Sequence, residues 1–347
     1  MPKKDWMVKE SDLDDDQLHV FNAILDKSCI VTGCAGSGKS VLALIKAQRI
    51  QKERGNDYQI IVYTKSLCGY MNSGREVLGL TNNFTYHWEW QNRRGMPSAD
   101  YTIVDEIQDF TRDEIEEFIK ATRKHFFFFG DSAQSIYKDF KETIPVEDIL
   151  YEFPQYRSST KTFDLYRNYR LPISVAKLAQ YVGENLPPIV SSVYQSKERQ
   201  LPFLLKYQNE QQQIEAIVKI VKDRSLTDVG IFMPDRTSVE RLHDMFKKNN
   251  VDIEVRYNKD GGSVDTLNFK TTLPKIMTYH SAKGLQFETV FIPMLPSIIQ
   301  NRSALYVAMT RTYHYLYMMY SGSMPNLLLN ASPEDYLTTT EVVIDDK

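Results

Sequence analysis

The sequence predicts an α/β protein with two parallel sheets, one after the other along the chain, each covered by helices on both faces. Short apolar segments rich in β-branched and aromatic residues alternate with longer amphipathic segments, a pattern typical of parallel sheets. The alternation runs up to about residue 160 and then starts again. A glycine-rich segment directly follows the first apolar run, at the end of a strand, where α/β folds bind their ligands.

The first set of elements surrounds that glycine-rich segment. Its apolar runs read as strands buried on both faces, because they lack the alternation of a half-exposed strand. Four consecutive phenylalanines, 126–129, suit a central strand, and core packing is their expected role. We expect strands at 28–33, 58–64, 101–106 and 125–131, and helices at 39–53, 66–78 and 112–123.

The second set has the same organisation. We expect strands at 229–234, 275–280, 289–295 and 315–321, and helices at 173–183, 210–223, 237–249 and 301–311. Residues 258–265 (NKDGGSVD) are interpreted as an exposed turn or loop. The polar segment QYRSSTKT sets the predicted boundary near residue 160. The predicted domains are therefore 1–160 and 161–330, followed by a weakly held tail at 331–347.

Composition favours a soluble cytoplasmic protein. Hydrophobic residues make up 42% of the chain and charged residues 25%, and neither a membrane span nor a signal-peptide core is recognisable. The three cysteines, Cys29, Cys34 and Cys68, have no metal-ligand spacing and suggest a reducing compartment. The net charge of −3 neither supports nor excludes binding of nucleic acid, since a basic groove can lie on an acidic protein.

Residues 33–40 (GCAGSGKS) fit the pattern G-x-x-x-x-G-K-[ST], with a strand before and a helix after. Glycines let backbone N–H groups surround phosphate oxygens, and the helix N-terminus adds positive charge. Lys39 would reach the β- and γ-phosphates, and Ser40 would hold Mg²⁺. The alternative is a glycine-rich turn with an exposed lysine. The predicted nucleotide-binding residues of this loop are Gly33, Cys34, Ala35, Gly36, Ser37, Gly38, Lys39 and Ser40.

A second acidic site lies at the end of another expected strand. Asp105 would hold the metal together with Ser40, and Glu106 would polarise the attacking water. The alternative for this pair is an acidic N-terminal cap on the next helix. Gln134 follows the next strand and is placed to contact the γ-phosphate, although a polar loop residue is more often simply solvated.

In order, these segments resemble the superfamily 1 helicases of the UvrD/Rep type. Besides the glycine-rich loop, the matching strings are LDDDQLHVFNAI, VYTKSL, TYHWEW, DEIQD, GDSAQSIY, LYRNYR, TYHSAKGLQF and LYVAMTRT, and the resemblance covers residues ~13–320. The resemblance implies two RecA-like P-loop NTPase domains that clamp ATP. It also implies that Gln17 reads adenine, that Gln286 faces the ribose, and that Arg170 and Arg311 stabilise charge on the transferred phosphoryl group.

The resemblance further implies a track for single-stranded nucleic acid across both lobes. Hydroxyl, amine and backbone groups would contact phosphates, and aromatic faces would stack on bases. Core packing is the alternative for each aromatic residue and for the second-lobe histidine. The implied contacts are Thr64, Lys65, Ser66, His87, Tyr137, Phe140, Thr278, His280 and Ser281.

The sequence also departs from the family pattern. His87 and Asp105 are only 18 positions apart, which is too few for the helical insertion that usually enlarges the first lobe. Arg170 and Thr278 are 108 positions apart, so the second-lobe insertion is absent or reduced to a loop near 257–272. Asp139 stands at the usual aromatic position, and Gln286 replaces a glutamate. The resulting hypothesis is a reduced ATP- and Mg²⁺-dependent motor on single-stranded DNA, with 3′-to-5′ polarity. The alternatives are a regulatory ATPase that controls a protein partner such as a nuclease, and an RNA-directed helicase.

Overall fold

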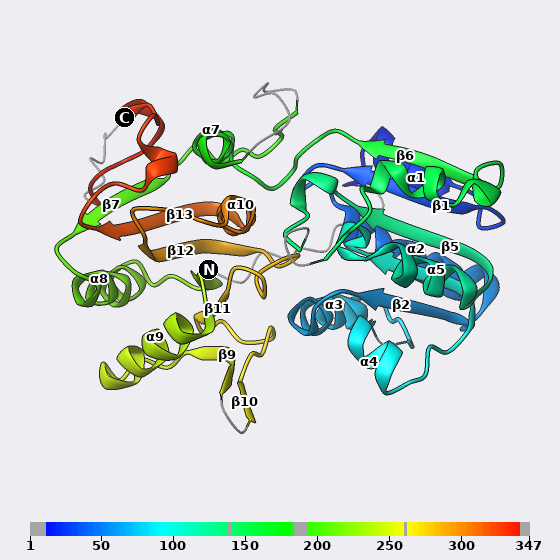
Figure 1. Cartoon of the computed structure of the whole chain (residues 1–347), viewed down its shortest axis with the longest axis horizontal. Helices are drawn as coiled ribbons and strands as arrows, with labels where there is room; N and C mark the ends of the chain where they lie inside the picture. The colour runs from blue at the N-terminus through cyan, green and yellow to red at the C-terminus, as the bar shows by residue number, and fades with distance from the viewer. Residues whose placement is uncertain (1–11, 83, 138–140, 184–192, 260–261, 341–347) are drawn as a thin grey trace. The chain divides into compact units, whose positions relative to one another are not determined.

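The computed structural model describes residues 12–82, 84–137, 141–183, 193–259 and 262–340. These residues form two compact units, an N-terminal unit that ends at Tyr169 and a C-terminal unit that begins at Arg170. Each unit contains one mainly parallel sheet flanked by helices (Figure 1). The predicted α/β class with two parallel sheets is therefore confirmed.

The N-terminal unit has a six-stranded sheet in the order β3-β2-β4-β5-β1-β6, and every pairing is parallel. Its strands are β1 (Ser28–Gly33), β2 (Tyr58–Val62), β3 (Phe84–Tyr86), β4 (Ala99–Asp105), β5 (Thr122–Gly130) and β6 (Thr160–Leu165). Its α-helices are α1 (Asp15–Asn22), α2 (Lys39–Arg54), α3 (Lys65–Val77), α4 (His87–Asn92), α5 (Arg112–Lys120) and α6 (Ile149–Glu152). Short 3-10 helices are η2 (Ile107–Asp109), η3 (Ser132–Gln134), η4 (Val146–Asp148) and η5 (Pro154–Tyr156).

The four phenylalanines of β5 are buried on both faces of this sheet, as predicted. Successive side chains of a strand point to opposite faces, so alternate phenylalanines join different layers. Phe126 and Phe128 pack in one core with residues of α5, including Phe118. Phe127 faces the other layer, where the Lys46 ammonium of α2 lies 5.5 Å from its ring. Burial on both sides explains why the segment is apolar throughout.

The C-terminal unit has a seven-stranded sheet in the order β10-β9-β11-β8-β12-β13-β7. All pairings are parallel except the β9–β10 hairpin. Its strands are β7 (Phe203–Tyr207), β8 (Val229–Met233), β9 (Glu254–Lys259), β10 (Gly262–Asp265), β11 (Lys275–Thr278), β12 (Phe287–Leu295) and β13 (Thr312–Ser321). Its helices are α7 (Ile173–Val182), α8 (Glu210–Asp223), α9 (Arg236–Lys248) and α10 (Arg302–Met309), with 3-10 helices η6 (Asn326–Leu328) and η7 (Pro333–Asp335).

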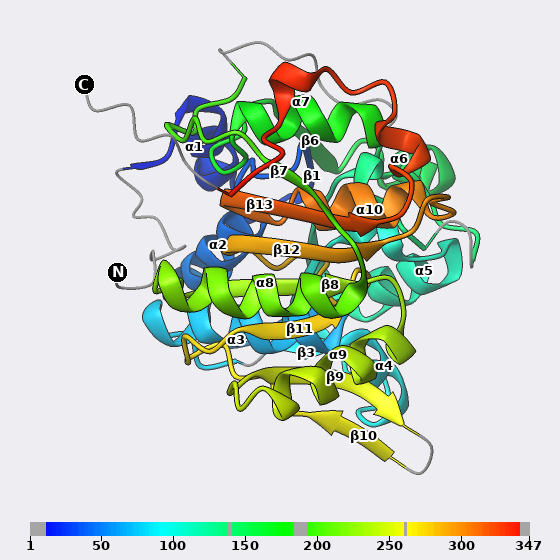
Figure 2. The same cartoon turned by 90° about the vertical axis from the view of Figure 1, so that its left-hand side faces the viewer.

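Helices α8 and α9 cover one face of the second sheet (Figure 2). Their apolar stripes pack on strand residues that include Phe203, Phe291 and Tyr317, and the Phe203 and Phe291 rings stack on Tyr317 with centroids 4.5 and 4.6 Å away. Helices α7 and α10 contact each other, and α10 also contacts strand β12 of the same sheet. None of the helices within the described ranges is long and apolar enough to cross a membrane.

All of the predicted strands and helices occur, with ends shifted by a few residues. The strands β3, β6, β7, β9 and β10 were not predicted. The segment 258–265 is therefore wrongly interpreted as a turn, because it contains the end of β9 and all of β10. The predicted boundary near residue 160 falls at the first residue of β6, and the two compact units divide after Tyr169.

Candidate nucleotide-binding site

The loop of residues 33–40 joins β1 to α2, as the motif requires. Lys39 lies in the first turn of α2, and its ammonium donates hydrogen bonds to the carbonyl oxygens of Gly33 (2.7 Å) and Cys34 (3.0 Å). These contacts fold the side chain back over the loop, and only 7% of Lys39 is exposed. The ammonium is thus held against the backbone of the loop that, in this motif, surrounds the phosphates of a nucleotide.

Gly38 is required by close approach as well as by backbone conformation. Its φ is +88°, and a Cβ at this position would lie 2.8 Å from the Gln17 amide nitrogen. Gln17 belongs to α1, and its Nε2 donates to the Ser37 carbonyl oxygen at 2.9 Å. Its Oε1 accepts a hydrogen bond from the Asp14 amide (3.2 Å), which completes a capping box at the start of α1. The structure therefore brings Gln17 to the glycine-rich loop.

The two predicted metal ligands are in direct contact. The Ser40 hydroxyl donates to Asp105 Oδ2 at 2.6 Å. Asp105 ends β4 and is fully buried, and burial, followed by the neighbouring charge of Glu106, raises its pKa to about 7. Two hard oxygen ligands suit Mg²⁺, which binds one or two protein groups and completes its shell with phosphate and water oxygens. Among the described residues, no group of three His, Cys, Asp or Glu side chains could hold a metal by itself.

Glu106 directly follows β4 in a strained conformation. Its φ and ψ are 59° and 43°, in the left-handed region that non-glycine residues rarely adopt. Such strain costs about 1–3 kcal/mol and is concentrated at functional sites. The side chain is 5% exposed and accepts a hydrogen bond from Gln108 Nε2 at 2.5 Å.

Gln108 continues a chain of hydrogen bonds from Glu106 to Gln134. Its Oε1 accepts from the Asp131 amide at 3.0 Å, and the Asp131 carboxylate accepts from Gln134 Nε2 at 2.5 Å. A Cβ on Gly130 would lie 2.6 Å from Gln108 Oε1, so the glycine makes room for this link. Gln108 was not among the predicted site residues. The available signal was an amide side chain two residues after Glu106, in the DEIQD motif.

Tyr169 is a second residue that the sequence analysis missed. Its backbone N–H donates to the Gly36 carbonyl oxygen at 3.0 Å, and its hydroxyl donates to the Asp14 carboxylate. The residue remains 38% exposed, so its ring lies at the surface beside the loop and the cap of α1. Nearby, the Cys34 thiol donates to the Tyr166 carbonyl oxygen at 3.5 Å.

In the C-terminal unit, Arg170 and Arg311 meet at one residue. Arg170 Nη2 donates to the Thr310 carbonyl oxygen and Arg311 Nη2 to the Thr310 hydroxyl, both at 3.0 Å. Arg311 is 1% exposed, and its Nε also donates to Val307 O at 2.9 Å. Gln286 is half-buried and precedes β12, whose first amide donates to the Arg311 carbonyl oxygen. The two predicted arginines are therefore neighbours.

The predicted nucleic-acid contacts of the N-terminal unit differ in exposure. Thr64 caps α3, with its hydroxyl accepting from the Leu67 amide at 3.1 Å, and Lys65 is exposed. Ser66 is buried. His87 is also buried, edge-on to Phe110 and 3.6 Å from the Glu114 carboxylate.

The remaining predicted contacts lie in two places. Tyr137 is half-buried, with its ring 4.4 Å from that of Tyr63, and Phe140 lies outside the described residues. At the end of β11, the Thr278 hydroxyl accepts from the Ser281 amide at 3.2 Å and forms a short turn that contains His280. Thr278, His280 and Ser281 are half-exposed, whereas Tyr279 between them is buried, and burial lowers the pKa of His280.

Comparisons with known proteins agree with this geometry. Residues 29–228 match the family model of the viral superfamily 1 RNA helicase core domain, and residues 275–319 match the UvrD-like helicase C-terminal domain. A protein of Acanthamoeba polyphaga mimivirus named "putative ATP-dependent DNA helicase" is 23% identical over 277 residues, which cover 70% of this chain and 38% of that protein. The chain thus spans well under half of this relative.

One solved structure is similar over part of the chain. It is the C-terminal domain of a possible DNA helicase from Lactobacillus plantarum, at 18% identity and a TM-score of 0.38, covering 49% of this chain and 98% of that one. The first family model alone matches more than half of the 347 residues. The chain belongs to the superfamily 1 helicases, which are ATP-dependent hydrolases built on two RecA-like lobes.

Proposed function

We propose that the chain is an ATP-driven motor that moves along single-stranded DNA. The observation that carries the proposal is the 2.6 Å contact between Ser40 and Asp105, beside Lys39 on one side and Glu106 on the other. This set can bind a triphosphate, hold Mg²⁺ and activate water within one unit. Bound Mg²⁺ would supply positive charge for the β- and γ-phosphate oxygens.

Each residue of the set has a distinct role in this proposal. Lys39 contacts the phosphates, and Asp105 and Ser40 hold the metal. Glu106 takes the proton of the attacking water, and the hydrogen-bond chain through Gln108 links its state to Gln134. Gln17 and Gln286 contact the nucleoside, and Arg170 and Arg311 neutralise charge on the phosphoryl group. Cys34 lies in the same loop, near the N-terminus of α2, which makes its thiol a candidate for nucleotide-protected alkylation.

DNA is preferred over RNA on the basis of the relatives. The mimivirus protein is named a DNA helicase, and the C-terminal match is UvrD-like. The match to a viral RNA helicase core keeps RNA as the competing substrate. The 3′-to-5′ direction rests on the resemblance to the UvrD type. For contact with the strand we propose the exposed Lys65, the half-exposed turn of Thr278 to Ser281, and Tyr137.

A second candidate function is a regulatory ATPase that acts on a protein partner. Few residues separate His87 from β4. Between α9 and β11, the described residues form only the β9–β10 hairpin. The insertions that contact duplex in similar helicases are thus missing. Strand displacement by the purified protein alone, measured beside its ATPase rate, separates an autonomous helicase from a regulated one.

The deciding experiment is a steady-state ATPase assay with DNA and RNA oligonucleotides of the same sequence. We expect single-stranded DNA to raise the turnover rate, and Glu106→Gln to bind ATP without hydrolysing it. The Lys39→Ala variant is the control for lost nucleotide binding. Equal rates with and without either nucleic acid would reject the motor, and stronger stimulation by RNA would replace DNA as the substrate.

A further inference from the structure

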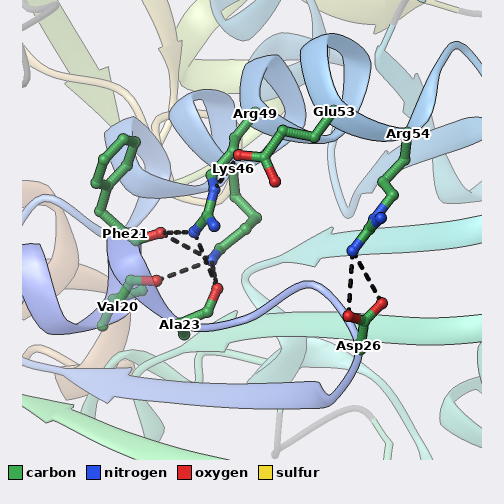
Figure 3. A network of polar contacts seen from close by, with 8 residues as sticks. All are labelled: Val20, Phe21, Ala23, Asp26, Lys46, Arg49, Glu53 and Arg54. Carbon is green, nitrogen blue, oxygen red and sulfur yellow. Dashed lines mark hydrogen bonds and ion pairs between the residues drawn. The ribbon is translucent and has the colours of Figure 1, made fainter.

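Lys46 is a buried lysine in the middle of α2, two turns after Lys39. It is 1% exposed, and its ammonium donates to the carbonyl oxygens of Val20 (2.8 Å), Phe21 (3.3 Å) and Ala23 (3.2 Å) (Figure 3). These three carbonyls lie at the C-terminal end of α1. The hydrolytic roles proposed above do not use Lys46.

The contacts answer a need of the helix end. The last carbonyls of a helix have no intrahelical partner, and the helix dipole favours positive charge there. Arg49, one turn further along α2, donates from Nη1 to the same Phe21 and Ala23 oxygens at 2.5 and 3.0 Å (Figure 3). Two cations of one helix therefore close the end of another.

Holding the end of α1 in this way requires burial of a charged ammonium group, which costs free energy. Burial lowers the pKa of Lys46 to about 8, with smaller effects from Cys29, Arg49 and Glu53. A methionine would fill much of the same space without a charge to bury, but it could not donate to the three carbonyl oxygens at the end of α1. The geometry must therefore supply a reason for a lysine here beyond packing.

The other end of α1 supplies that reason. Gln17 lies there, bonded to the Ser37 carbonyl oxygen and packed against Gly38. Helix α2 begins in the same loop, so it carries the phosphate-binding Lys39 at its N-terminus and Lys46 two turns later. Helix α1 is thus fixed at both ends to the loop and the helix that bind the triphosphate.

We infer that Lys46 is a positioning residue for recognition of the nucleotide base, because it sets where α1 presents Gln17 to the loop. The inference rests on the proposed contact of Gln17 with the base. Arg49, which is more exposed than Lys46, helps to hold the end of α1 through its bonds to the Phe21 and Ala23 oxygens. Arg54, on the same helix, instead donates from Nη2 to both carboxylate oxygens of Asp26, beyond the end of α1, at 3.0 and 3.1 Å (Figure 3). Arg54 therefore provides a matched control.

The test measures the ratio of the dissociation constants for GTP and ATP, each with Mg²⁺, by competition against a fluorescent ATP analogue. We expect the native protein to prefer ATP, and Gln17→Ala to lower the ratio by about tenfold, the value of one hydrogen bond. Lys46→Met is expected to lower it by a similar factor, and Gln17→Ala with Lys46→Met to lower it no further. Arg54→Met should keep the native ratio.

A merely structural lysine would give a different pattern. In that case Lys46→Met would weaken ATP and GTP binding equally, and the unchanged ratio would overturn the inference. An unchanged ratio in Gln17→Ala would also overturn it, and the proposed motor activity is tested separately, by the stimulation of ATP hydrolysis by DNA in the native protein. Should Lys46→Met fail to fold, Arg49→Met, which removes two of the same contacts from the rim, is expected to lower the ratio by a smaller factor, and an unchanged ratio there would again overturn the inference.

Discussion

Asp105 and Glu106 are adjacent carboxylates that the fold treats differently. Asp105 accepts hydrogen bonds from the Ser40 hydroxyl and the Glu106 amide, and Glu106 is turned into the left-handed region with its carboxylate on Gln108. The strained backbone thus separates a group that can hold a metal from a group that can accept a proton. Both are buried, so both depend on neighbours in place of water.

The raised pKa of Asp105 predicts how stability responds to pH. The folded protein keeps the proton of Asp105 up to about pH 7, while the unfolded chain releases it near 3.8. Between these values the folded state binds more protons, so the free energy of unfolding falls as pH rises. Asp105→Asn cannot ionise and escapes this loss. Without nucleotide or metal, its melting temperature should exceed that of the native protein at pH 8.

Thermal unfolding at several pH values checks this expectation. The difference between the Asp105→Asn and native melting temperatures should shrink toward pH 5, at about 2–4 °C for each kcal/mol. Asp131→Asn serves as a comparison, because Asp131 is a carboxylate at the carboxyl end of the neighbouring strand β5. A difference that stays constant from pH 5 to pH 8 would contradict the assignment of a raised pKa to Asp105.

Sequence spacing located the residues that the loop motif and the strand ends define. Lys39, Ser40 and Asp105 follow from the motif and from where buried strands end, and the structure brings them together. Gln108 and Lys46 could not be found in this way. Their roles depend on partners 23 and 26 residues away in sequence, which only the packed fold brings near.

At the scale of elements, four of the five unpredicted strands lie at the edges of the sheets, and the fifth, β9, pairs with the edge strand β10. The edge strands of the two sheets are β3, β6, β10 and β7, and none of them was predicted. A central strand is buried on both faces and reads as an apolar run, but an edge strand carries polar residues that blunt its open side. β6 shows this well, since TKTFDL places most of its side chains at the surface.

Helix α5 offers a test of how its own sequence sets its start. Thr111 accepts a hydrogen bond from the Glu114 amide at 3.3 Å, and the Glu114 carboxylate accepts one from the Thr111 amide at 2.7 Å. Thr111→Ala removes half of this capping box and should cost about 1 kcal/mol of unfolding free energy in a urea titration. Thr111→Ser keeps the oxygen and should remain near the native value. Equal losses in both variants would assign the effect to the lost methyl group.

At the scale of the whole molecule, the restart of the strand–helix pattern predicted two α/β units. The predicted boundary near 160 rested on a polar segment, whereas the contacts divide the chain after Tyr169. The two boundaries differ because β6 pairs in parallel with β1 through six residue pairs, so this polar segment belongs to the first sheet. Parallel pairing over more than a hundred residues leaves no local signal in composition.

The division after Tyr169 assigns the two arginines to the C-terminal unit and the glycine-rich loop to the N-terminal unit. If hydrolysis depends on both units, Arg170→Ala should keep ATP binding and lose turnover by about 10³-fold or more, because the charge on the phosphoryl group is no longer neutralised. Arg170 is half-exposed and donates to the Thr310 backbone oxygen, whereas Arg311 is buried, so we expect removal of Arg170 to disturb the fold less than removal of Arg311.

Binding of a fluorescent ATP analogue and single-turnover hydrolysis, measured on the same preparation, test this dependence. Arg170→Lys keeps the charge without the planar fork and should recover part of the rate. Arg311→Lys reports whether the second arginine acts through the same residue, since both guanidinium groups bond to Thr310. Native turnover in Arg170→Ala would show that the N-terminal unit hydrolyses ATP without this arginine, and the proposed catalytic role of Arg170 would fall.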